Sequence, residues 1–173
     1  VRHKSPNTRW YSGAGIYRNV YLRIRNKEYI EENGVYISPR LEGDEWKVYI
    51  DTEAVGGSRI AHSILDENGS EIGAAVGKSC VIKVKDPKLW DIYKGNLYTL
   101  RTALYNGETV VDRQMNTFGF RTVSLDPQKG FIINGRHEKM HGVCMHHDLG
   151  ALGSAMNEAA LKRQLDILVS YGV

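Results

Sequence analysis

Residues 98–111 read Tyr98-Thr99-Leu100-Arg101-Thr102-Ala103-Leu104-Tyr105-Asn106-Gly107-Glu108-Thr109-Val110-Val111. The residues at every second position share one face: Tyr98, Leu100, Thr102 and Leu104. Alternation with a period of two is typical of a half-buried β-strand. Asn106-Gly107 then separates this run from the next apolar pair, Val110-Val111, and such a dipeptide is a strong hairpin signal. The stretch therefore predicts two antiparallel strands.

The same alternation recurs on both sides of the next turns along the chain. One row is Trp46, Val48 and Ile50, and a second is Ile60, His62 and Ile64. Gly56-Gly57 and Asp66-Glu67-Asn68-Gly69 supply residues that tolerate the positive φ angles of tight turns. Six or seven short strands over about 90 residues indicate an immunoglobulin-like β-sandwich.

Composition places the chain among ordinary globular proteins. It has 173 residues, of which 42% are hydrophobic and 25% charged, and its formal net charge is +3. The positive charge is too small and too scattered to predict nucleic-acid binding, and no apolar run approaches the ~20 residues of a membrane span. Its two cysteines, Cys80 and Cys144, are interpreted as free, mostly buried thiols, although a disulfide stays open. The compartment stays unknown.

The N-terminal stretch Arg9-Trp10-Tyr11-Ser12-Gly13-Ala14-Gly15-Ile16-Tyr17-Arg18-Asn19-Val20-Tyr21-Leu22 is rich in bulky apolar side chains. The eight residues before it are too few and too polar to pack against them. We interpret the stretch as the last strand of a domain whose body lies outside this chain.

After Arg121 the sequence pattern changes. Asn134-Gly135 predicts a second hairpin, and residues 141–148 are interpreted as a strand. A helix is predicted from Ala155 to Tyr171, with Ser154 or Asn157 as its N-cap. Its apolar stripe comprises Leu161, Leu165, Leu168 and Val169.

These terminal motifs resemble those of glycoside hydrolase family 2, the family of β-galactosidases, β-glucuronidases and β-mannosidases. The Arg9–Leu22 stretch is similar to the end of its N-terminal jelly-roll domain. The C-terminal motifs resemble the entry to its catalytic (β/α)8 barrel: Gly119-Phe120-Arg121, Phe131-Ile132-Ile133-Asn134-Gly135-Arg136 and His141-Gly142-Val143-Cys144-Met145-His146-His147-Asp148. Asp86-Pro87-Lys88-Leu89-Trp90 resembles a loop before a late strand of the family's sandwich.

The resemblance implies a mainly β fold: an immunoglobulin-like β-sandwich with a C-terminal hairpin, strand and helix from the start of a (β/α)8 barrel. The expected domains are residues 1–28, the end of the jelly roll; 29–118, the sandwich; and 119–173, an incomplete barrel. Within the family, His146-His147-Asp148-Leu149-Gly150-Ala151-Leu152-Gly153 most resembles bacterial β-galactosidases, and β-glucuronidase is the alternative.

The candidate substrate-binding residues are His146 and Asp148. On a strand they would share one face with Cys144, because side chains alternate, and barrel enzymes place strand C-terminal ends at the active site. The resemblance implies that both side chains contact sugar hydroxyls, to which imidazole and carboxylate groups can hydrogen-bond. Cys144 stands where the family usually has Asn. The competing interpretation for His146 is a structural or surface histidine.

We expect no catalytic residue and no metal site in this chain. Retaining glycosidases need two carboxylates ~5–5.5 Å apart, and the family's acid/base lies in an Asn-Glu dipeptide at a strand end. The only such dipeptide here, Asn157-Glu158, begins the predicted helix. Cys144, His146 and Asp148 are spaced too widely along a strand to converge on one ion.

The leading interpretation is thus an excised section of a family 2 glycosidase with a carbohydrate substrate, no cofactor and no activity by itself. The competing class is a non-catalytic immunoglobulin-like module used in binding. We also expect the apolar stripe of the C-terminal helix to fold back on the sandwich, dock on another copy or remain mobile.

Overall fold

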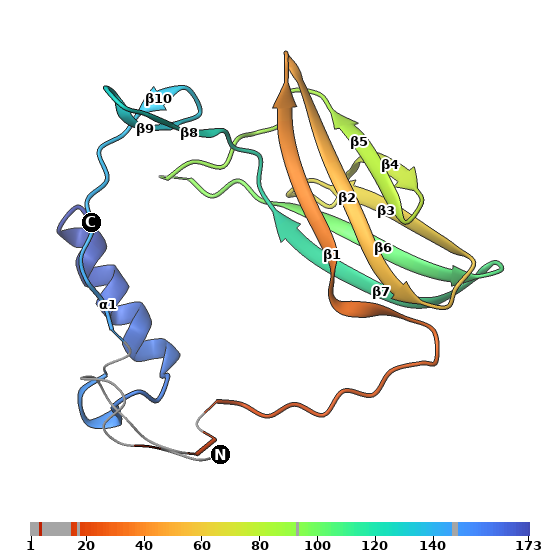
Figure 1. The fold of residues 1–173 in the computed structure, drawn as a ribbon, viewed down its shortest axis with the longest axis horizontal. Coiled ribbons are helices and arrows are strands. Elements are labelled where there is room, and N and C mark those ends of the chain that lie inside the picture. Colours follow the sequence, from red (N-terminus) through yellow and green to blue (C-terminus); the bar gives the residue numbers. More distant parts are fainter. Residues whose placement is uncertain (1–3, 5–14, 17, 93, 147–148) are drawn as a thin grey trace. The chain divides into compact units, whose positions relative to one another are not determined.

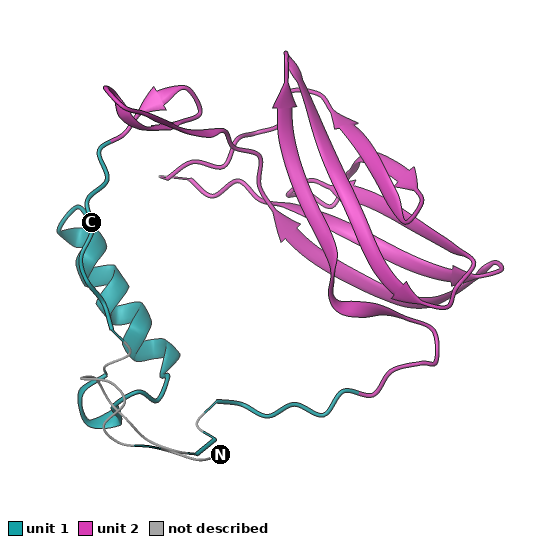
Figure 2. Ribbon diagram, viewed as in Figure 1, with its two compact units in different colours: residues 1–23, 139–173 teal, residues 24–138 magenta. Residues whose placement is uncertain are grey.

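The computed structural model describes residue 4 and residues 15–16, 18–92, 94–146 and 149–173. The chain divides into two units (Figure 2). One comprises Ile24–Glu138, and the other comprises Val1–Arg23 together with Lys139–Val173.

The first unit contains a two-sheet sandwich, as predicted (Figure 1). Its seven strands are β1 (Tyr29–Glu42), β2 (Glu45–Val55), β3 (Arg59–Leu65), β4 (Glu71–Val76), β5 (Ser79–Val84), β6 (Tyr98–Asn106) and β7 (Thr109–Phe118). One sheet has the order β1-β2-β5 and the other β4-β3-β6-β7, with every pair antiparallel. This architecture is an immunoglobulin-like β-sandwich.

The predicted alternation decides which side chains enter the core. Of the three residues predicted to share a face of β2, Val48 and Ile50 are at most 1% exposed and Trp46 is 6% exposed. The predicted face of β6 is buried throughout, and on β3 His62 and Ile64 are buried while Ile60 is half-buried. Because burial of a large apolar side chain contributes about 1.5–3 kcal/mol, these rows fix the register of both sheets.

Phe120, two residues after β7, closes one end of the core and is fully buried. Its ring makes edge-on contacts with Tyr98 at a centroid distance of 4.9 Å and with Trp46 and Phe118 at 5.3 Å each. Edge-to-face pairs at such distances stabilise a core beyond the area that they bury. The Phe of the Gly119-Phe120-Arg121 motif is therefore a core residue of the sandwich.

Side chains from β7 join the two sheets along one edge. Asp112 Oδ2 accepts a hydrogen bond from the Ile30 amide at 2.8 Å, and Gln114 Nε2 donates to the carbonyl oxygens of Ile30 and Glu31. The register of β1 against β2 shifts just after Ile30, where Asn33 has a φ of 57°. The bulge frees the backbone groups that the β7 side chains then satisfy.

Three short strands follow the sandwich in the same unit: β8 (Val123–Asp126), β9 (Gly130–Ile133) and β10 (Arg136–His137). Their sheet order is β10-β9-β8. Asn134 and Gly135 form the two-residue turn with φ values of 50° and 75°, so the predicted hairpin is confirmed.

In the second unit, η1 (Gly150–Leu152) precedes α1 (Glu158–Ser170), which confirms the predicted helix. Asn157 is its N-cap, because its Oδ1 accepts from the Ala160 amide at 2.9 Å. The half-buried positions are Ala160, Leu161, Gln164 and Leu168, whereas Leu165 and Val169 of the predicted stripe are exposed. No helix in the described residues is both long and apolar enough to span a membrane.

Two details of the sequence interpretation were wrong. The described residues 141–146 of the strand expected at 141–148 form no strand, because no ladder with another described segment holds them in a pleated conformation. Cys144 is exposed rather than buried, while Cys80 is half-buried, and both are free thiols.

Candidate functional site

The connection between the sandwich and the β8–β10 sheet brings together motifs that lie far apart in the sequence. Trp90, from the loop before β6, donates its backbone amide to the carbonyl oxygen of Phe120 at 2.8 Å. The Arg121 guanidinium lies 4.7 Å from the centre of the Trp90 ring, which is a cation–π contact. The Asp86–Trp90 loop and the Gly119–Arg121 motif therefore form one structure.

Asn134 links this structure to the β9–β10 turn. Its Oδ1 accepts from the Thr122 amide at 3.1 Å, and its Nδ2 donates to the Trp90 carbonyl at 3.0 Å. The Thr122 carbonyl in turn accepts from the Asn134 amide at 3.0 Å. The backbone of Asn134 thus adopts the left-handed turn conformation, and its side chain forms hydrogen bonds with two backbone groups.

Arg136 completes the connection through charge. Its guanidinium donates to both carboxylate oxygens of Asp91, at 3.0 and 3.2 Å, and to Glu138 Oε1 at 2.5 Å. This hydrogen-bonded pair raises the pKa of Arg136 and lowers the pKa of Asp91. Trp90, Asp91, Arg121, Asn134 and Arg136 are called the junction cluster below. The cluster fixes the course of the chain up to Glu138, immediately before the segment that carries His146.

His146 is exposed and lines a small pocket of about 60 Å³ between its own segment and α1. The other lining residues are Leu149, Ser154, Ala155, Met156, Leu161 and Gln164. The pocket is too small for a sugar ring, so His146 lies at its edge rather than inside a formed sugar site. Asp148, the second candidate, lies outside the described residues.

Cys144 lies in a different place from His146. It lines a pocket of about 280 Å³ together with Val143, Met145, Gln164, Ile167 and Leu168. Val143, Cys144 and Met145, which should alternate between two faces, all line the same pocket. Cys144 and His146, which should share a face, line different pockets. The alternating faces predicted for this segment were therefore wrong. The cause is the missing strand ladder, which would otherwise impose the period of two.

The described residues contain no group of three His, Cys, Asp or Glu side chains that could hold a metal ion. Glu158 of the Asn157-Glu158 dipeptide is the exposed first residue of α1. A carboxylate at this end of a helix is stabilised by the positive end of the helix dipole. This dipeptide is therefore a helix start in the structure.

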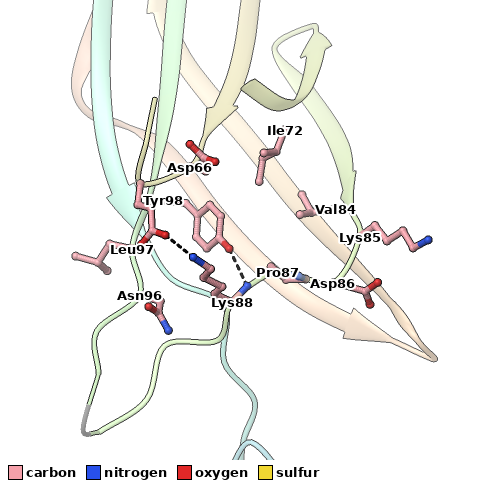
Figure 3. A pocket seen from close by; sticks show the side chains of 11 residues that line it. Asp66, Ile72, Val84, Lys85, Asp86, Pro87, Lys88, Asn96, Leu97 and Tyr98 are labelled. Carbon is pink, nitrogen blue, oxygen red and sulfur yellow. Dashed lines mark hydrogen bonds and ion pairs between the residues drawn. The ribbon is translucent and has the colours of Figure 1, made fainter. Parts of the chain in front are cut away.

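A further cavity, of about 270 Å³, opens at the end of the sandwich between the β3–β4 turn and the loop after β5 (Figure 3). The Tyr98 hydroxyl accepts from the Lys88 amide at 2.8 Å, and Glu67 pairs with the Lys88 ammonium. Asp66 Oδ1 accepts the amides of Asn68 and Ser70. These contacts lower the pKa of Asp66 and of Glu67, so neither carboxyl serves as a proton donor at neutral pH.

The junction cluster was missed at the level of sequence, although its parts were recognised. The Asn-Gly signal identified the turn at Asn134 but not the bond of its side chain to Trp90, 44 positions away. The only available signal was that the two segments belong to motifs of one family.

Comparison with known proteins gives a consistent result. The family model described as "Glycosyl hydrolases family 2" matches residues 28–121. The chain is 40% identical to "Beta-galactosidase BoGH2A" of Bacteroides ovatus and 35% identical to a "Putative beta-glucuronidase" of Formosa agariphila, with 98% and 97% of this chain aligned. It spans 22% and 17% of the length of these relatives.

Among solved structures, the β-glucuronidase from Ruminococcus gnavus resembles this chain with a TM-score of 0.74. The match covers 82% of this chain and 24% of that protein, at 23% sequence identity. At this identity the likeness concerns the fold.

Proposed function

The chain belongs to glycosyl hydrolase family 2, and we propose that it is the central section of a longer retaining glycosidase that hydrolyses terminal β-glycosidic bonds. The observation that carries the proposal is the 40% identity to a β-galactosidase along 98% of the chain. Since the chain spans about a fifth of that relative, the activity is proposed for the longer protein.

The proposed division assigns residues 1–28 to the end of a jelly-roll domain, 29–118 to the sandwich and 119–173 to the start of a (β/α)8 barrel. Phe120 still packs in the core of the sandwich, two residues past the last boundary. The junction cluster attaches the β8–β10 sheet directly after it, which supports a change of domain near this point. In this role the sandwich anchors the β8–β10 sheet through the junction cluster.

We assign β-galactosides as the substrate and keep β-glucuronides as the alternative. The stretch from His146 to Gly153 resembles β-galactosidases, and the relative with 40% identity has that name. The alternative is favoured by the 35% identity to the Formosa agariphila protein, whose name is a putative β-glucuronidase.

In the proposed mechanism the two carboxylates lie on other parts of the longer protein. One attacks the anomeric carbon while the other protonates the leaving oxygen, and water then hydrolyses the glycosyl-enzyme. His146 and Asp148 would hydrogen-bond the hydroxyls of the bound sugar and so orient the ring for attack. The chain alone is expected to hydrolyse no glycoside.

A non-catalytic immunoglobulin-like module is the competing proposal, because a sandwich alone does not determine function. The junction cluster and the helix that follow the sandwich favour the enzyme, since a free-standing binding module has no need of either.

The test is an assay of the longer protein with aryl β-galactoside and aryl β-glucuronide. Turnover of the galactoside at least tenfold faster in kcat/KM supports the assignment. Faster turnover of the glucuronide supports the alternative, and turnover of neither substrate rejects both. The 173-residue chain is the matched control, and hydrolysis by it would contradict the placement of the carboxylates.

A further inference from the structure

The outer face of the β4-β3-β6-β7 sheet carries a groove with a volume of about 300 Å³. It is lined by Ala61, Ser63, Arg101, Ala103, Tyr105 and Arg113. By the alternation of β3 and β6 these residues lie on the face opposite to that of His62, Thr102 and Leu104, and among them Ala103 is itself buried, at 8% exposed. The volume is at the lower end of the range typical of small-molecule sites.

Three of the residues that line the groove are small: Ala61, Ser63 and Ala103. Ala61 on β3 lies directly opposite Ala103 on β6, and Ser63 lies opposite Arg101. The half-buried Ala61 and Ser63 offer a methyl group and one hydroxyl, which suit the apolar face and the hydroxyls of a pyranose ring.

Arginine side chains surround these small residues. Arg113 lies directly opposite Ala103, and its guanidinium has no hydrogen-bond or ion-pair partner in the described part of the chain. Arg101 makes two long hydrogen bonds, to Ser63 Oγ at 3.2 Å and to Glu71 Oε2 at 3.4 Å. Arg59, beside the groove, is held 3.9 Å from the centre of the Tyr105 ring.

The groove therefore has an excess of positive charge. No acidic side chain is among the described residues that line it, and Glu71 is the one carboxylate recorded in contact with its arginines. A guanidinium binds a carboxylate through two parallel hydrogen bonds, which makes Arg the preferred partner of that group.

The position of the groove argues against an extended acidic peptide. It lies over the face of β3, β6 and β7, and β3 and β6 are each paired on both sides, so their backbone groups are already used in the sheet. An added peptide strand would gain no main-chain hydrogen bonds here, unlike at a sheet edge. Recognition must come from side chains, as in binding of a sugar ring that carries a carboxylate.

We propose that this groove is a secondary binding site for uronate-containing oligosaccharides, with Arg101 and Arg113 binding the carboxylate and Ala61 and Ser63 supporting the ring. The choice of a carbohydrate over other carboxylates rests on the proposed function as a glycosidase. The site lies on the sandwich, and none of its residues belongs to the segment that carries His146.

The test is isothermal titration of the 173-residue chain with a galacturonic acid tetramer at 50 mM salt. Arg113→Gln and Arg101→Gln should each weaken binding about tenfold or more, since each removes a charged hydrogen-bonding partner. Arg113→Lys, which keeps the charge but loses the two-pronged geometry, should retain an intermediate affinity. The matched control is Arg40→Gln, which removes an exposed arginine stacked on Tyr49 in the other sheet.

Two further ligands separate the alternatives. The methyl-esterified tetramer lacks the charge and should bind at least tenfold more weakly, whereas equal binding would overturn the role of the arginines. Poly-glutamate is the second ligand. If it binds as tightly as the tetramer and loses the same affinity in Arg113→Gln, the ligand of the groove is an acidic peptide rather than a sugar. No binding of the tetramer at millimolar concentration rejects the site.

Because titration of the chain requires no turnover, its result is independent of the glycosidase assay. Binding without hydrolysis by the longer protein would reject only the proposed function. Hydrolysis by the longer protein without binding here would reject only the groove.

Discussion

Asn134 and Trp90 are joined by a hydrogen bond of 3.0 Å from the Asn134 side-chain amide to the Trp90 carbonyl oxygen. This bond attaches the β9–β10 turn to the loop that precedes β6, and the same side chain accepts from the Thr122 amide. The contact fixes where the chain leaves the sandwich, and we expect the stability of the junction cluster to depend on it.

Asn134→Ala should lower the free energy of unfolding by about 2–4 kcal/mol. The variant loses two hydrogen bonds at about 0.5–1.5 kcal/mol each and places alanine at a φ of 50°, which costs about 1 kcal/mol. Urea unfolding monitored by tryptophan fluorescence measures the change. Asn134→Gly is the control, because it loses the same two hydrogen bonds but adopts a positive φ without strain, so it should lose about 1 kcal/mol less than Asn134→Ala. Equal loss in both variants would contradict the contribution of the turn conformation.

Thr52 and Thr102 are a matched pair for the effect of a buried hydroxyl. Both side chains are fully buried, but Thr102 Oγ1 lies 3.1 Å from His62 Nδ1, whereas Thr52 Oγ1 has no partner among the described residues. Thr102→Val should therefore destabilise the sandwich by about 1 kcal/mol. Thr52→Val removes an unsatisfied group and should be neutral or stabilising by up to about 1 kcal/mol. Thermal unfolding of both variants measures the difference, and the same sign of effect in both would contradict the argument.

His62 should make stability depend on pH. Burial lowers the pKa of its imidazole, and the hydrogen bond of Nε2 to the Gly77 carbonyl at 3.1 Å only partly opposes this effect. The unfolded chain therefore binds a proton at higher pH than the folded chain does. The stabilising contribution is complete above the unfolded pKa of about 6.5 and is lost as the pH falls toward the folded value.

The measurement for His62 is a series of urea midpoints between pH 5 and pH 8. The wild-type midpoint should fall on the acid side of pH 6.5, and the fall should be smaller in His62→Gln, which cannot be protonated. His137→Gln changes an exposed histidine and is the control. If the urea midpoint of His62→Gln falls with pH as steeply as that of the wild type, His62 is not the cause of the pH dependence.

How far the sequence predicts this structure differs between its two units. In the sandwich, a period of two predicted the buried rows that include Trp46, Ile50 and Leu100, because each strand has a core on one side. In α1 the apolar period predicted the helix but not its buried side. Gln164 is half-buried while Leu165 is 48% exposed, since the buried face depends on what the helix packs against.

The candidate site was less predictable than the fold. His146 could be identified only from the family motif, because a histidine in a polar stretch has no periodicity of its own. The strand expected around it depended on a neighbouring strand, and pairing between segments cannot be read from one segment. The hydrogen bond from Asn134 to Trp90 could not be predicted for the same reason, because it joins positions that only the folded chain brings together.

The exposed apolar residues of α1 should promote self-association of the 173-residue chain. Leu165 is 48% and Val169 is 69% exposed, and apolar surface of this kind favours a partner. Sedimentation velocity over a concentration series should show reversible association, and Leu165→Glu with Val169→Glu should reduce it at least tenfold. Lys162→Gln with Arg163→Gln changes two exposed residues of the same helix and lowers the net charge by the same amount, so it controls for the change in charge. Monomers at all concentrations would contradict this expectation.

His146→Ala in the longer enzyme should lower kcat/KM by about 10- to 100-fold. The estimate corresponds to the loss of one substrate hydrogen bond, about 1–3 kcal/mol when its partner is left unsatisfied. The loss should be greatest for the sugar whose hydroxyl the imidazole binds. An analogue deoxygenated at that hydroxyl should be hydrolysed equally by wild type and variant, whereas a purely structural histidine would affect all sugars alike. His141→Ala, an exposed histidine five positions earlier, is the control and should retain full activity.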